Sequence, residues 1–94
     1  MERTIKFIWD YFGPPAIRTA EHHNIHLREF AEAEQLSIQK TGFEKHSDEH
    51  ASAYILLAEN DALRLKDVLK PHKAIVEKDA WAAAYQQYPK AIFA

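Results

Sequence analysis

Residues 13–36, GPPAIRTAEHHNIHLREFAEAEQL, form the stretch around which the fold of this chain is organised. Gly13 ends the segment that precedes it. Pro14 and Pro15 fix φ near the helical value and lack an N–H, which costs nothing in the first turn of a helix. Apolar residues then recur at three- and four-residue spacing, at Ile17, Ala20, Leu27, Phe30 and Ala31. The pattern predicts a helix over residues 16–36.

Three histidines lie on this predicted helix. At 100° per residue, His23 falls beside the apolar stripe, whereas His22 and His26 fall together on the polar side, one turn apart. We therefore expect His23 to be partly buried and the other two to face water.

The segment before the helix, residues 4–12, alternates in the manner of a β-strand. One face carries Ile5, Phe7, Trp9 and Tyr11, and the other face is made partly apolar by Ile8 and Phe12. Both faces of the strand are therefore predicted to need burial.

After the helix, residues 37–46 and 51–58 read as two strands joined by a turn at residues 47–49. This register places Gly42 opposite Tyr54, whose ring can cover the bare backbone, and His46 opposite His50. The alternative is one long helix over residues 43–69. The apolar run from Ile55 to Leu57 would point around most of that helix, so the pattern favours the hairpin.

The remaining chain predicts a short helix, capped by Asn60 or Asp61 and ending at Lys70 before Pro71, and then a strand over residues 73–77. A further helix can begin at Asp79, with Trp81, Tyr85 and Tyr88 along one face. We expect one domain over residues 1–94, with a core at 4–77 and a C-terminal tail at 78–94. Its order, strand–helix–strand–strand–helix–strand, is the ferredoxin-like βαββαβ order of an α+β sandwich. Its sheet is antiparallel, with two helices on one face.

The element order, the aromatic strand Phe7-Ile8-Trp9-Asp10-Tyr11-Phe12 and the segment His22-His23-Asn24-Ile25-His26-Leu27 resemble the dimeric α/β-barrel superfamily. YciI-like proteins of that superfamily also carry a histidine in the first helix. The resemblance covers most of residues 4–77 and implies the fold and a homodimer, in which two sheets face each other. The apolar second face of the sheet favours the same association.

Composition excludes several classes of protein. The chain has 94 residues, a net charge of −2 and no cysteine, so disulfides and thiolate sites are ruled out. It has no basic run, so we expect no nucleic-acid or membrane partner. The start, Met1-Glu2-Arg3, lacks the apolar core of a signal peptide, so we expect a cytoplasmic protein. Its two glycines, Gly13 and Gly42, form no phosphate-binding loop, and no residue pattern names a cofactor.

Histidine pairs are the first candidate for chemistry. His22 and His26 are spaced to clamp a divalent metal from one helix face, and His46 and His50 become cross-strand neighbours in the hairpin. The functional interpretation is a Zn, Ni or Cu site. The alternative is that all four are solvated surface histidines, because neither pair has a third ligand from the pattern alone.

His23 is the second candidate, as a general base near Asp10 or Glu44. Desolvation would lower its pKa and a nearby carboxylate would raise it, so the direction stays open. The alternative is a partly buried histidine that bonds to the backbone.

Three aromatic residues, Trp9, Tyr11 and Tyr54, are candidates to line a cavity for a flat apolar ligand, either between sheet and helices or at the dimer interface. The alternative is that they fill the core. Three classes of function therefore remain: a small-ligand enzyme or binding protein, a histidine-based metal-binding protein, and an interaction module without catalysis.

Overall fold

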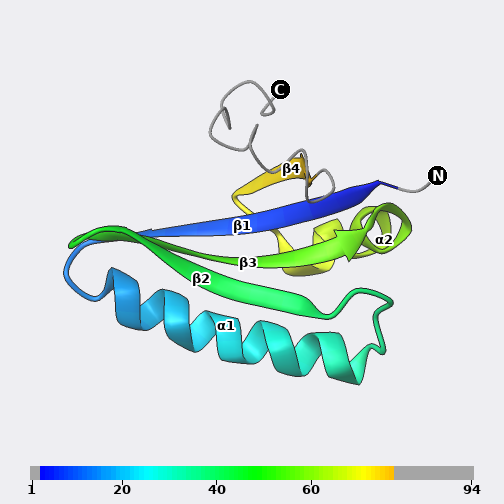
Figure 1. Cartoon of the computed structure of the whole chain (residues 1–94), viewed down its shortest axis with the longest axis horizontal. Helices are drawn as coiled ribbons and strands as arrows, with labels where there is room; N and C mark the ends of the chain where they lie inside the picture. Colours follow the sequence, from blue (N-terminus) through cyan, green and yellow to red (C-terminus); the bar gives the residue numbers. More distant parts are fainter. Residues whose placement is uncertain (1–2, 78–94) are drawn as a thin grey trace.

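The computed structural model describes residues 3–77, which form a four-stranded antiparallel sheet and two helices (Figure 1). The elements in chain order are β1 Thr4–Phe12, α1 Ala16–Ala33, β2 Lys40–Ser47, β3 His50–Ala58, α2 Glu59–Leu69 and β4 Lys73–Glu77. The α+β architecture is confirmed, and the bounds predicted for the first and last of these strands are the observed ones. The predicted helix around Trp81 lies outside the described residues.

The strands lie in the order β2-β3-β1-β4, and every neighbouring pair is antiparallel. The hairpin prediction is confirmed, and the alternative helix over residues 43–69 is wrong. Gly42 pairs with Tyr54 as expected. The predicted pairing of His46 with His50 is wrong, because the turn contains only Asp48 and Glu49 and an irregularity between Lys45 and Ser47 leaves Ser47 opposite His50.

The core lies between the sheet and both helices. Its strand residues alternate along β1 and β3, and its helix residues include three alanines of α1 that permit a close approach to the sheet: Phe7, Trp9, Ala51, Ala53, Ile55, Leu57, Ala16, Ala20, Ala31, Leu27, Ala62 and Leu65. Figure 1 shows α1 running along the sheet beneath β2 and β3.

Two details of α1 differ from the prediction. The helix ends at Ala33, because Gln35 turns back with φ of 52° while Leu36 still packs into the core. Phe30 is half-buried, and Asn24 occupies a buried position with its Oδ1 left without a hydrogen-bond partner in the described structure. The buried face of α1 is therefore rotated slightly from the face that its apolar residues predicted.

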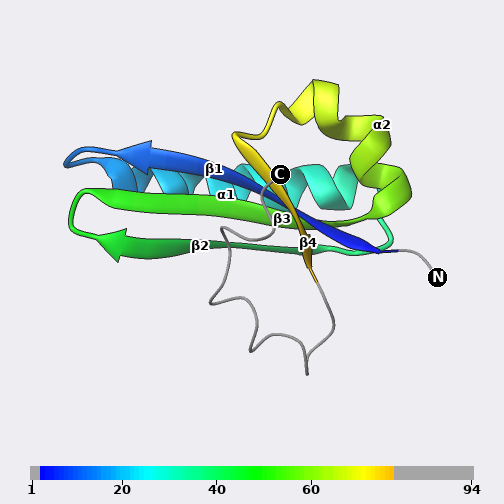
Figure 2. The ribbon, with the colours of Figure 1, turned by 90° about the horizontal axis from the view of Figure 1, so that it is seen from above.

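The opposite face of the sheet carries neither α1 nor α2; Figure 2 shows the strands side by side in front of α1. This open face is mixed in character. Its apolar part includes Ile8, Tyr54, Leu56 and Ile75, and its polar part gathers at the hairpin end: Asp10, Glu44, His46, His50 and Ser52. No helix within residues 3–77 is long and apolar enough to cross a membrane.

Candidate metal site

The hairpin end of the open face brings together three side chains from three strands. In β1, Trp9 and Tyr11 contact the helix side, so the intervening Asp10 points to the open face. In β3, Ala51 and Ala53 are core residues, so His50 and Ser52 share the face of Asp10. The β2 irregularity then turns His46 onto the same face, where its Nε2 and the Oγ of Ser52 are 2.7 Å apart.

Asp10, His46 and His50 each offer one ligand atom, and these atoms all lie within 4.8 Å of one another. His50 Nε2 lies 3.0 Å from Asp10 Oδ1, and the two imidazole rings have their centroids 4.5 Å apart. A neutral His50 donates its Nε2–H to the carboxylate. A metal ion bound through that nitrogen would take the place of this proton.

The carboxylate of Asp10 stays ionised. Burial alone would raise the pKa of Asp10, but hydrogen bonds and charge from Lys73 and His50 outweigh it and hold the pKa below its ordinary value. Lys73 Nζ lies 2.8 Å from Oδ2, on the oxygen that His50 does not contact. Asp10 is therefore a charged ligand, already fixed in place from two sides.

Two neighbours orient the histidines. Ser52 is almost fully buried, and its Oγ lies within hydrogen-bond distance of Nε2 of His46, which restricts the orientation of that ring. The ring of Phe12 stacks on His50 with centroids 4.4 Å apart and an angle of 14° between the planes. These contacts restrict both imidazole rings before any ion arrives.

The donor set is two imidazoles and one carboxylate, the combination that binds first-row transition metals and leaves coordination positions open. Asp10 has only 10% of its side chain exposed and His50 has 32%, whereas His46 is exposed. An ion would therefore rest against the sheet, with its other side open to solvent.

His23 lies on the other side of the sheet, in a second cluster. Its Nδ1 is 2.7 Å from the hydroxyl of Tyr11, and its ring centroid is 4.7 Å from that of Trp9. Burial, followed by the nearby His26 and His72, lowers the pKa of His23, and burial raises the pKa of Tyr11. His23 and Asp10 are thus on opposite faces, and the structure does not bring them together as an acid–base pair.

Between these two clusters, His72 forms hydrogen bonds with the main chain of β1. The N–H of Asp10 donates to Nδ1 of His72 at 2.9 Å, and the N–H of His72 donates to the carbonyl of Ile8 at 2.9 Å. His72 therefore extends the β1–β4 pairing by one step beyond Lys73, and it anchors the backbone of the residue whose side chain would bind metal.

The other predicted pair, His22 and His26, has its two Nε2 atoms 2.9 Å apart on the exposed face of α1. Glu29 Oε1 is 3.6 Å from the other nitrogen of His26. Within residues 3–77, the group formed by Asp10, His46 and His50 is the one that brings three potential ligands together. The pair on α1 has two.

The predicted ligand-binding aromatics are divided between the two faces. Trp9 and Tyr11 pack on the helix side, where Trp9 Nε1 donates to the carbonyl of Leu69 at 3.2 Å. Tyr54 lies on the open face, with Nζ of Lys6 4.4 Å from its ring centroid. These three rings therefore do not line one cavity.

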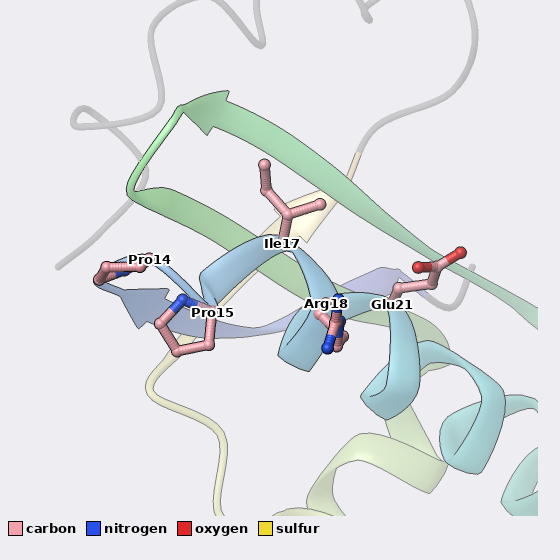
Figure 3. A pocket seen from close by; sticks show the side chains of 5 residues that line it. All are labelled: Pro14, Pro15, Ile17, Arg18 and Glu21. Carbon is pink, nitrogen blue, oxygen red and sulfur yellow. The ribbon is translucent and has the colours of Figure 1, made fainter.

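An open depression lies at the start of α1, lined by Pro14, Pro15, Ile17, Arg18 and Glu21 (Figure 3). Figure 3 shows its walls to be the proline corner and the first turns of the helix. None of the residues proposed from the sequence for ligand or metal binding belongs to it.

From the sequence, we named Asp10, His46 and His50 as candidate site residues, but we did not predict that these three residues, the metal group, form one site. Asp10 was paired with His23, and the supporting residues Ser52, Lys73 and Phe12 were missed. The alternation of β1 contains part of the signal, since Asp10 must oppose Trp9 and Tyr11. The adjacency of β1 and β3, which completes the site, has no local signal.

No protein family, curated protein or solved structure matches this chain.

Proposed function

We propose that this protein binds a divalent transition-metal ion through Asp10, His46 and His50. The observation that carries the proposal is the convergence of their ligand atoms within 4.8 Å, from three strands, on a face that neither helix covers. Imidazole and carboxylate donors together suit Zn²⁺, Ni²⁺ or Cu²⁺, and the geometry favours no single one of them.

The surroundings support this function over a pair of solvated surface histidines. Asp10 is mostly buried and ionised, Ser52 and Phe12 hold the imidazoles, and Lys73 balances the carboxylate while the ion is absent. Ordered ligands lose less conformational freedom on binding than free surface side chains do.

Ligand-dependent stabilisation tests the proposal, because an ion that binds only the folded chain raises its free energy of unfolding. At an ion concentration 100 times the dissociation constant, the gain is about 2.7 kcal/mol. We expect Zn²⁺ or Ni²⁺ to raise the melting temperature of the wild type but not that of a His46→Gln, His50→Gln double variant.

The matched control is His22→Gln with His26→Gln, which removes the exposed pair on α1. This control protein should keep the full stabilisation by metal. If it loses the stabilisation while the His46/His50 variant keeps it, the metal site is on the helix and the proposal is wrong.

We further propose that the fold is ferredoxin-like and that two copies pair through the open face as a dimeric α/β barrel in the cytoplasm. The strand order and the apolar residues Ile8, Tyr54 and Leu56 support this assembly. Ile8 and Tyr54 form the same-face pair next to Asp10 and Ser52, and the apolar part extends from them away from the hairpin end. Sedimentation at micromolar concentration should give twice the chain mass, and a monomer would remove the barrel.

The proposal changes where a small-molecule ligand would bind. The aromatics Trp9, Tyr11 and Tyr54 do not share a cavity, so a ligand is expected to meet the metal rather than those rings.

A further inference from the structure

The metal group leaves room for a ligand that does not come from the protein. Three protein ligands leave one position open in a tetrahedral ion and three in an octahedral one. Because His46 is exposed and His50 is partly exposed whereas Asp10 is mostly buried, the open positions face the solvent above the sheet. A small molecule can therefore reach the ion directly.

The charge of the site favours an anion. Asp10 is already paired with Lys73, so its negative charge does not neutralise a divalent ion by itself. Glu44 is exposed and lies opposite Ser52 on the same face, and the turn residues Asp48 and Glu49 add two more exposed carboxylates at this end of the sheet, of which Asp48 is paired with Lys45. The ion and the two charged groups in closest contact with it and with each other, Asp10 and Lys73, together have two positive charges in excess.

Phe12 gives this site an aromatic surface. Its ring is stacked on His50 and the residue is 69% exposed, so the stacked side faces a metal ligand and the other side faces solvent. Core packing does not explain why Phe12 lies so exposed at the rim of a charged site. Its exposed edge can contact a flat ring held close to the ion.

We propose that the bound metal takes a small aromatic carboxylate as its exogenous ligand, with the carboxylate on the ion and the ring against Phe12. This inference rests on the proposed metal site. A carboxylate oxygen occupies an open position and reduces the excess charge, and the aromatic contact discriminates between rings and saturated groups of similar size. Aromatic pairs contribute on the order of 0.5–1.5 kcal/mol beyond their buried area, which corresponds to about 2- to 10-fold in affinity.

Visible absorption of the Co²⁺-loaded protein tests this proposal, because the d–d bands report the ligands of the ion. Three probes are compared at saturating Co²⁺: benzoate, cyclohexanecarboxylate, which has the same charge without the aromatic ring, and benzamide, which has the ring without the charge. We expect benzoate to change the spectrum at the lowest concentration, cyclohexanecarboxylate to require about 2- to 10-fold more, and benzamide to have no effect.

A Phe12→Leu variant should lose the preference for benzoate over cyclohexanecarboxylate. Phe43→Leu is the matched control, because Phe43 pairs with Ala53 on the helix side of the sheet and should leave the preference unchanged. If no Co²⁺ spectrum forms, the metal site itself is wrong. If the spectrum forms but benzoate leaves it unchanged, or if both carboxylates act equally on the wild type, the inference is wrong while the metal site stands.

Discussion

The ring of Tyr54 lies over the backbone of Gly42 on the neighbouring strand. A Cβ placed on Gly42 would come within 2.6 Å of Cζ of Tyr54, closer than van der Waals contact allows. The same ring receives the ammonium of Lys6 on its face. A glycine and a tyrosine thus form one cross-strand unit on the open face.

Because Gly42 and Tyr54 are in contact, we expect substitutions at these two positions to have non-additive effects on stability. Gly42→Ala should lower the free energy of unfolding by about 1–3 kcal/mol, because the tyrosine ring must move off the strand. In a Tyr54→Leu background the same change should cost less, with a coupling energy of about 0.5–3 kcal/mol. Urea unfolding of the four proteins gives the coupling, and additive effects would show that the ring does not need the glycine.

Asn24 predicts a stabilising substitution. Its side chain is buried on α1 and its Oδ1 accepts no hydrogen bond within the described residues, which costs about 1–3 kcal/mol in folded proteins. Asn24→Leu should therefore raise the free energy of unfolding, and Asn24→Ala, which leaves space unfilled, should raise it less. A loss of stability in the leucine variant would mean that the amide has a polar partner in the folded protein.

The sequence located the strands and the α1 start because each has a local signal: alternation from Ile5 to Tyr11, and the Pro14-Pro15 pair. The Gly42–Tyr54 pairing also followed from the hairpin pattern. The fine register at His46 did not, because a two-residue turn and a bulge produce nearly the same sequence spacing as a three-residue turn.

The candidate site shows where local reasoning stops. Asp10 and His50 are 40 positions apart, and they meet only because β1 lies beside β3 in one particular register. The helical histidines were placed on the correct sides of α1 from 3.6-residue periodicity alone, with His23 half-buried and His22 and His26 exposed. Contacts within an element were therefore predictable, and contacts between non-consecutive strands were not.

His23 predicts a pH dependence of stability. Burial lowers its pKa in the folded protein, so the unfolded chain takes up a proton as the pH falls through about 6.5, and the folded chain does so only at lower pH. Its contribution to stability is complete above the unfolded pKa and decreases as the pH falls below it.

The measurement is the loss of free energy of unfolding between about pH 7.5 and pH 5, compared between the wild type and His23→Gln. The variant should lose less over this range. His22→Gln, an exposed neighbour, is the control and should lose as much as the wild type. An equal loss in all three proteins would show that His23 does not titrate differently in the folded state.

Substitution of Ser52 should change the affinity for metal without changing the fold. The hydroxyl of Ser52 forms a hydrogen bond with Nε2 of His46 and so orients the ring, and removing such a support typically weakens metal binding about 10- to 100-fold. Ser52→Ala should show this loss in Zn²⁺ titration calorimetry while its melting temperature without metal stays close to that of the wild type. Ser37→Ala, an exposed serine outside the strands, should bind as the wild type does.

The central claim is that Asp10, His46 and His50 bind one metal ion, and the histidine ring signals in NMR report on it directly. On addition of one equivalent of Zn²⁺, we expect the ring signals of His46 and His50 to shift together and to stop changing at one ion per chain, whereas those of His22 and His26 should stay in place. If His22 and His26 shift instead, or if no histidine responds at stoichiometric zinc, the site proposed on the open face of the sheet is wrong.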